Sequence, residues 1–331
     1  MSPHDAESRL FRLLSLSRLK GVGKVTLNKI VSSGQIDLKI EDVCKNILKK
    51  SYTDAELKVA QDFADSQLSS SQKLAHTIVP IWDSRYPVNL KATRDSPPFL
   101  YCAGSVEVLN SSSVAVIGTR EPTKAGIEIA RRITSFLCEN DWNIVSGLAI
   151  GVDTIAHLTA LEKNAKTTCV MAHGLDSVYP KQNQQTFEQI LDSGGCAVSE
   201  YSYGTTVRSQ FLVQRDYIQA GLSAAVVLIQ SDHVGGSLHA SRRILKYNRP
   251  LVVAGQSSVD ISNDEPKIHA NLTLLGESTS EKEKLLKCAP IPSDLLFKLK
   301  SKNDYSALCE LLKSINTQIH QTTLNQNDFL L

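Results

Sequence analysis

Val114-Ala115-Val116-Ile117-Gly118-Thr119-Arg120 is an apolar run rich in β-branched residues that ends in a glycine and opens a helix-like segment. Two other stretches share this pattern: Ile144-Val145-Ser146-Gly147-Leu148-Ala149-Ile150-Gly151, and Val226-Val227-Leu228-Ile229 ahead of Gly235-Gly236-Ser237. A strand that ends in glycine and leads into a helix brings backbone N–H groups close to an anion, and the helix dipole favours negative charge there. One such turn is a weak signal, because glycine also permits tight turns. Three in one sheet predict a cleft that holds several phosphates of a nucleotide or a nucleic acid.

Short apolar runs alternate with amphipathic segments from Ser113 to about Gly255. Buried β-branched strands that alternate with helices are typical of an α/β fold with a doubly wound, mostly parallel sheet. Ligands of such sheets bind beyond the carboxyl ends of the strands, where all three glycine turns fall. The expected strands are 114–117, 143–146, 167–171, 196–199, 224–229 and 250–254.

The flanking segments differ from this core in composition. Residues 1–72 are expected to form a small helical domain of the helix-hairpin-helix or SAM-like kind, with its hairpin at Lys20-Gly21-Val22-Gly23-Lys24. Such a hairpin either presents amides to a DNA phosphate or only packs two helices, and both interpretations stay open. Residues 73–258 are expected to form the core. Residues 259–331 contain less glycine and more lysine and serine, which favours a small helical appendage or a partly ordered, short helical tail.

Composition excludes some classes of protein. The 331 residues carry a formal net charge of +2, which by itself does not indicate a nucleic-acid partner. The seven cysteines are scattered without a Cys-x-x-Cys pair, so we expect neither a metal site nor a cofactor. No apolar run is long enough to span a bilayer, and the first residues lack a signal pattern, so we expect a cytoplasmic protein without a membrane partner. The segment from Arg208 to Arg249 is locally basic and is the best sequence evidence for a polyanion.

The candidate site residues lie on the glycine turns and on nearby basic or aromatic positions. Arg120 offers a planar fork that suits phosphate, whereas the plain alternative is a solvated surface arginine. Arg208, Phe211 and Arg215 combine charge with a ring that can stack on a base, although Phe211 also fits a core position. The residues predicted to bind nucleic acid or phosphate are Gly118, Thr119, Arg120, Ser146, Gly147, Lys181, Asn183, Arg208, Phe211, Arg215, Gly236 and Ser237. We predict no catalytic residue; His157 is interpreted as a helix-packing histidine.

Many of these motifs occur in the order that is typical of one family. They are Gly21-Val22-Gly23, Tyr86-Pro87, Pro97-Pro98, Val116-Ile117-Gly118-Thr119-Arg120, Val145-Ser146-Gly147-Leu148-Ala149-Ile150-Gly151-Val152-Asp153, Tyr179-Pro180-Lys181, Ser199-Glu200-Tyr201 and Gly236-Ser237-Leu238. In this order they resemble the DNA-processing protein A family (DprA, also called Smf), over roughly residues 10 to 256.

The resemblance carries expectations about function. It implies an extended Rossmann-like core, a homodimer, and a protein that binds and protects single-stranded DNA and helps to load a RecA-type recombinase, without being an enzyme. It also implies phosphate contacts at Gly118, Thr119, Arg120, Gly147 and Lys181. The chain departs from the family where it reads Arg215-Asp216-Tyr217 in place of the usual Arg-Asn-Arg, and no C-terminal winged helix is recognisable.

These departures keep two other classes of function open. One is a regulatory module that binds a partner protein, such as a neighbouring toxin or a phage-defence component. The other is an enzyme that acts on nucleotides. The fold resembles nucleotide-cleaving proteins whose glycine-rich turn ends in a glutamate, but here Arg242 stands at that position, so the acid that this chemistry needs is missing.

Overall fold

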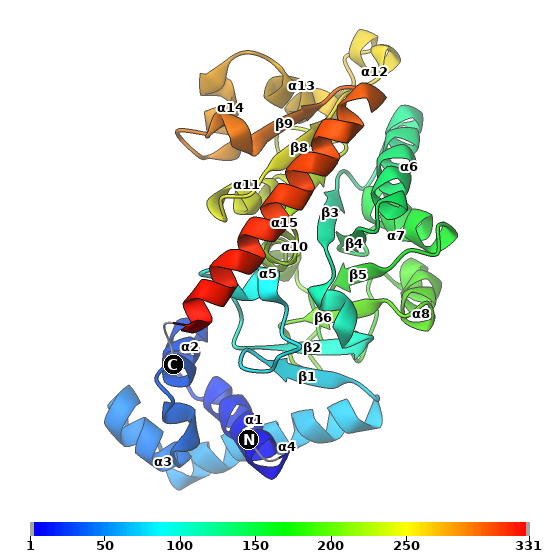
Figure 1. Ribbon diagram of the computed structural model, residues 1–331. Coiled ribbons are helices and arrows are strands. Elements are labelled where there is room, and N and C mark those ends of the chain that lie inside the picture. Colours follow the sequence, from blue (N-terminus) through cyan, green and yellow to red (C-terminus); the bar gives the residue numbers. More distant parts are fainter. Residues whose placement is uncertain (1–2, 329–331) are drawn as a thin grey trace.

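The computed structural model describes residues 3–328 and contains one nine-stranded sheet with helices on both faces (Figure 1). The strand order is β1-β2-β6-β5-β4-β3-β7-β8-β9. From β6 to β9 every neighbouring pair is parallel, whereas β2 runs antiparallel to both β1 and β6. The strands are β1 (Thr77–Pro80), β2 (Phe99–Gly104), β3 (Ser113–Ile117), β4 (Asn143–Ser146), β5 (Thr167–Val170), β6 (Cys196–Ser199), β7 (Ala225–Leu228), β8 (Leu251–Ala254) and β9 (Leu296–Leu299). The predicted α/β fold with a mostly parallel sheet is confirmed, and all six strands expected from the sequence are present.

The helices divide between the two faces of the sheet. One face is covered by α6, α7 and α15, whose apolar side chains pack on Val114, Val116 and Ile144. The other face is covered mainly by α5, α10, α11, α13 and α14, which pack on Ala115, Ile117 and their neighbours. The α-helices that follow the N-terminal group are α5 (Val88–Lys91), α6 (Lys124–Glu139), α7 (Val152–Glu162), α8 (Gln184–Asp192), α9 (Ser209–Gln214), α10 (Asp216–Leu222), α11 (Leu238–Lys246), α12 (Ser258–Ser262), α13 (His269–Leu275), α14 (Thr279–Leu286) and α15 (Tyr305–Asp328).

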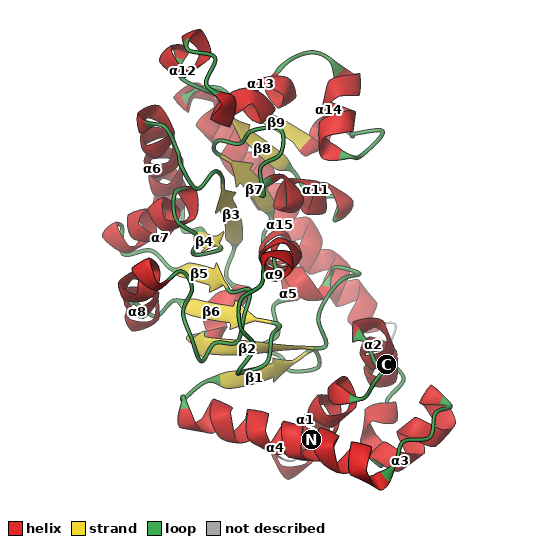
Figure 2. Ribbon diagram, turned by 180° about the vertical axis from the view of Figure 1, so that it is seen from behind, coloured by secondary structure: helices red, strands yellow, loops and turns green. Residues whose placement is uncertain are grey.

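The N-terminal residues form a separate group of helices below the antiparallel edge of the sheet (Figure 2). They are α1 (Pro3–Arg18), α2 (Lys24–Ser32), α3 (Ile40–Val43) and α4 (Asp54–Lys73). Their apolar core continues into the sheet through Tyr101 and Tyr203, whose ring centroids lie 4.9 Å apart. Asn28 donates to the carbonyl of Ser96 at 2.8 Å, and the ammonium of Lys24 lies 4.1 Å from the ring centroid of Tyr217. The helical start of the chain is therefore docked on the core.

Two segments contribute more to the sheet than the sequence predicted. Residues 76–100, which read as an extended connector, contain β1 and the start of β2. Residues 259–331, expected as a helical appendage or tail, contain β9 as well as helices, and β9 pairs with β8 in parallel register from Leu251↔Leu296 to Ala254↔Leu299. Helix α15 then packs on α6, where the rings of Phe136 and Tyr305 stack with their centroids 4.1 Å apart. Within the residues that the structure describes, no helix is long and apolar enough to cross a membrane.

The topology creates one switch point. Strand β3 is followed on one side by β4 and β5, whereas β7 and β8 extend the sheet on its other side. The connection after β3 leads to α6 on one face, and the connection after β7 leads to α11 on the opposite face. Two loops that leave a sheet toward opposite faces open a crevice between them. The candidate site lies in this crevice.

Candidate nucleic-acid interface

A cavity of about 440 Å³ lies at the carboxyl ends of β3 and β7. It brings together the turn after β3, the start of α7, helices α9 and α10, and the loop before α11. Of the residues predicted from the sequence, Gly118, Thr119, Arg120, Arg215, Gly236 and Ser237 line it. It is also lined by Asp153, Asp216, Gln219, Ser231 and Asp232, which the sequence prediction did not include.

The turn after β3 is held by backbone hydrogen bonds while its arginine stays free. Thr119 donates its N–H to the carbonyl of Gln230 at 2.8 Å and accepts from the N–H of Val152 at 3.2 Å. A Cβ at Gly118 would lie 2.7 Å from Cγ2 of Val152, so only glycine fits there without displacement. Arg120 is exposed and forms no salt bridge within residues 3–328. The turn therefore presents a guanidinium to solvent from a fixed backbone.

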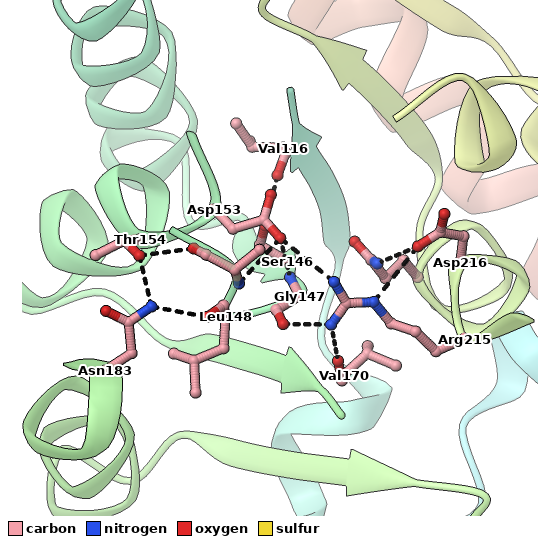
Figure 3. A network of polar contacts seen from close by, with 12 residues as sticks. Val116, Ser146, Gly147, Leu148, Asp153, Thr154, Val170, Asn183, Arg215 and Asp216 are labelled. Carbon is pink, nitrogen blue, oxygen red and sulfur yellow. Dashed lines mark hydrogen bonds and ion pairs between the residues drawn. The ribbon is translucent and has the colours of Figure 1, made fainter. Parts of the chain in front are cut away.

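The second glycine turn, between β4 and α7, already holds an anion of its own (Figure 3). The carboxylate of Asp153 accepts from the N–H of Gly147 at 3.1 Å and from the N–H of Ala149 at 3.3 Å. Ser146 is buried, and its hydroxyl donates to the carbonyl of Val116 at 2.7 Å. The amides and the hydroxyl that the sequence assigned to a phosphate thus have partners inside the protein.

Arg215 is the cation that balances this carboxylate. Its side chain is buried, and Nη1 donates to the carbonyls of Gly147 and Val170. Nη2 lies 3.6 Å from Oδ2 of Asp153, and Nε lies 3.4 Å from Oδ1 of Asp216 (Figure 3). A Cβ at Gly147 would overlap the guanidinium. Arg215 therefore fixes the loop between β4 and α7, and its donors face the protein more than the cleft.

Two buried carboxylates share this single guanidinium. Burial raises the pKa of Asp153, against the opposing effect of Arg215 and of the backbone donors. Burial raises the pKa of Asp216 from its ordinary value of 3.8 to about 7, with Arg215 and Arg120 opposing the shift and Asp153 adding to it. Both acids are thus harder to ionise than in water, since desolvation disfavours the charged form.

A smaller hollow of about 200 Å³ continues the cleft past Arg120. Tyr179, Pro180 and Gln182 line it, so the exposed Lys181 stands in the segment that borders it. Asn183 is buried instead, and its Nδ2 donates to the carbonyl of Leu148 and to Oγ1 of Thr154, each at 2.8 Å. In this segment the lysine is available to a ligand, whereas the asparagine holds the neighbouring loop.

The remaining predicted residues lie on the rim. Arg208 is exposed, and its guanidinium lies 5.5 Å from the ring centroid of Phe211, which packs on Tyr201 at 4.4 Å between centroids. Gly236 is exposed just before α11, and the hydroxyl of Ser237 donates to that of Ser231 at 2.9 Å. Phe211 is half-buried, which is intermediate between a core position and an exposed ring that stacks on a base. Gly236 and Ser237 thus belong to the cavity lining, and Arg208 and Phe211 are the neighbours in sequence of the lining residues Ser209 and Leu212.

The locally basic segment from Arg208 to Arg249 is less basic at the surface than in sequence. Arg249 is buried and donates to the carbonyls of Gly221, Ser223 and Asn89. Arg242 donates to the carbonyl of Leu285, and Arg243 pairs with Asp95 at 3.0 Å.

His157 is buried against Thr167, and burial lowers its pKa to about 3. Among the described residues, no three His, Cys, Asp or Glu side chains gather as a group that could hold a metal ion.

Comparisons with known proteins show the family to which the chain belongs. A family model described as DNA recombination-mediator protein A matches residues 77–281. The chain belongs to this family. Its relatives include the Smf protein of Synechocystis sp., 34% identical over 218 residues, which are 63% of this chain and 53% of the relative. The DNA processing protein DprA of Bacillus subtilis is 30% identical over 183 residues (55% and 61%), and that of Streptococcus pneumoniae is 33% identical over 184 residues (56% and 64%). The matched region thus spans about half to two thirds of these relatives.

Two solved structures of the DprA family share the fold. The DprA of Streptococcus pneumoniae superposes with a TM-score of 0.65 at 26% identity, covering 82% of this chain and 98% of that one. The DNA processing protein A of Helicobacter pylori superposes with a TM-score of 0.56 at 26% identity, covering 71% and 96%. The latter is described by its single-stranded DNA binding mode. The extended Rossmann-like core expected from the sequence motifs is thereby confirmed.

Proposed function

We propose that this chain binds single-stranded DNA along the cleft at the carboxyl ends of β3 and β7. The observation that carries the proposal is the exposed Arg120, fixed on a strand-end turn and free of any salt bridge within residues 3–328. Lys181 stands exposed beside the continuation of the same cleft. Helix α11 begins at the third turn, and its dipole favours a further phosphate near Gly236 and Ser237.

A single strand fits this surface better than a duplex. The rim carries apolar and aromatic side chains on which unpaired bases can pack: Ile150, Tyr179 and Val213 are 42%, 43% and 40% exposed. Stacking on such side chains tolerates any base, because every base has a π-face. In a duplex the same faces are covered by neighbouring bases. The Helicobacter pylori relative, which is described by its single-stranded DNA binding mode, supports single-stranded DNA as the ligand.

Family membership supports a proposed biological role. It includes the protection of DNA, help in loading a RecA-type recombinase, action as a homodimer, and a cytoplasmic location. We assign no catalysis to the chain. Where related nucleotide-cleaving proteins carry a glutamate, Arg242 instead anchors the carbonyl of Leu285 with hydrogen bonds of 3.2 and 2.9 Å.

A second candidate function is a regulatory module that binds a partner protein, such as a toxin or defence component. It is favoured by the carboxylate of Asp216 in the cleft and by Val234, which is 91% exposed on the loop before α11. A carboxylate repels a phosphate chain, and an exposed apolar side chain is suited to a protein surface.

Binding titrations by fluorescence anisotropy separate these functions. We expect oligo-dT to bind more tightly than a duplex of the same length. If Arg120, Lys181 and Arg208 each neutralise one phosphate, the slope of log affinity against log salt should be roughly −2, at about −0.7 per contact on a single strand. Absence of binding at low salt, or equal affinity for the duplex, would reject the single-strand function and favour the partner protein.

A further inference from the structure

One wall of the main cleft carries hydrogen-bond acceptors on the side chains of Asp216 and Gln219. Asp216 and Gln219 line it, and they are only 7% and 2% exposed. Nε2 of Gln219 donates to Oδ1 of Asp216 at 2.9 Å, and Nε of Arg215 lies 3.4 Å from the same oxygen. These contacts use one carboxylate oxygen and leave Oδ2 for a ligand. Oε1 of Gln219 also lacks a hydrogen-bond partner within residues 3–328.

The described contacts of Asp216 leave its Oδ2 without an internal donor, so a group that donates to this oxygen is stabilised in the cavity. A phosphate is disfavoured next to the carboxylate of Asp216, because it brings negative charge and only acceptors. The other lining residues nearby are apolar, namely Ile117, Leu212, Val213 and Ala240. A flat apolar ring with an N–H group at its edge matches both kinds of wall.

We propose that this cavity takes one unpaired nucleobase of the bound strand, and that Asp216 accepts a hydrogen bond from an exocyclic amino group of that base. The inference rests on the proposed single-strand function. It gives the cleft two roles: the exposed Arg120 in the cavity lining and Lys181 beside its continuation bind phosphates, whereas the buried wall at Asp216 reads the base. The chain would then prefer bases that carry an amino group over thymine.

Cytosine and thymine give the sharpest comparison, because they are pyrimidines of similar size. Cytosine presents an N4 amino donor where thymine presents an O4 acceptor. The donor can pair with the carboxylate, whereas the acceptor faces it with like partial charge. A hydrogen bond to a charged group changes affinity by roughly tenfold or more. We therefore expect oligo-dC to bind about tenfold more tightly than oligo-dT of equal length.

The experiment compares the two oligonucleotides on the wild-type protein and on Asp216→Asn at about pH 8, where a carboxyl with a pKa near 7 is mostly ionised. The side-chain amide that this substitution introduces can turn either its oxygen or its nitrogen toward the base, so the preference should disappear. Glu121→Gln is the matched control. It removes a negative charge next to Arg120 from a side chain that is 77% exposed and paired with Lys267, outside the cavity. This control should shift both affinities alike and keep their ratio.

Each outcome decides one point. Equal affinity of the wild-type protein for oligo-dC and oligo-dT overturns the base-reading inference and leaves the single-strand function standing. Failure to bind either oligonucleotide overturns the proposed function itself. A preference for oligo-dC that survives in Asp216→Asn overturns the role of Asp216 and means that another group recognises the base. The wild-type comparison keeps the test valid even if the variant does not fold.

Discussion

Arg120→Ala is expected to weaken binding of single-stranded DNA without lowering the stability of the fold. Its side chain is exposed and forms no salt bridge among the described residues, so truncation removes no internal contact of that kind. A charge-assisted hydrogen bond to a phosphate contributes about 1.5–3 kcal/mol. The expected loss of affinity is therefore roughly ten- to hundred-fold. One fewer phosphate contact should also make the log–log salt slope less steep by about 0.7.

Anisotropy titrations at several salt concentrations, together with thermal melts, measure both effects. Arg131→Ala is the matched control, because it removes an exposed arginine from α6, the helix that follows the same turn. The control should leave the affinity close to that of the wild-type protein. If the two variants weaken binding equally and share one salt slope, Arg120 contributes only net charge. A lowered melting temperature for Arg120→Ala would instead give this side chain a structural role.

Three further predictions follow from the contacts of neighbouring residues. Lys181→Ala should weaken binding at unchanged melting temperature, and its effect should add to that of Arg120→Ala within about 0.5 kcal/mol if the two groups bind separate phosphates, which a double-mutant cycle measures. Arg215→Ala should lower the free energy of unfolding by about 3–5 kcal/mol, because it leaves Asp153 and Asp216 buried without their cation. Urea titrations measure this loss, and a loss below about 1 kcal/mol would contradict the structural role of Arg215. Because burial raises the pKa of Asp216 from 3.8 to about 7, the folded state holds this proton more tightly than the unfolded state, so stability should fall as pH rises from about 4 to 7. Thermal melts of Asp216→Asn should show a smaller fall over that range, and an unchanged pH profile would exclude Asp216 as its source.

The central strands were predictable because a parallel strand buried on both faces reads as an unbroken apolar run. Strands β3, β6, β7 and β8 contain three or more consecutive apolar residues, whereas β5 begins with Thr167 and Thr168 and β4 has polar residues at both ends. The edge strands lack such a run. Strand β1 ends in Pro80, and β9 is a four-residue strand that contains Lys298 and is only partly buried. Such segments become strands through pairing with β2 and β8, which their own sequence does not specify.

The position of the cleft was predictable, but the partners of its polar groups were not. Glycine turns after parallel strands meet at one edge of a sheet by topology alone, so Gly118, Gly147 and Gly236 point to the region where the cleft lies. The hydrogen-bond partner of each polar group in the cleft depends on residues that are distant in sequence. Arg215 donates to the carbonyl of Gly147 across 68 positions of sequence. Gln219 carries no sequence signal of a role in the cleft, and it is recognised only from its neighbours.

The internal charges determine where a phosphate chain can lie. Asp153 occupies the amides of Gly147 and Ala149, so this glycine turn has no capacity left for an external anion. Arg215 is committed to two carbonyls and two carboxylates, and Asp216 makes the inner wall repel negative charge. The exposed cations at the cleft are Arg120 in its lining, Lys181 beside its continuation and Arg208 next to the lining residue Ser209. On the proposed function, phosphates lie along the exposed cations while Asp216 accepts an uncharged donor, so backbone affinity and base preference should respond to different substitutions.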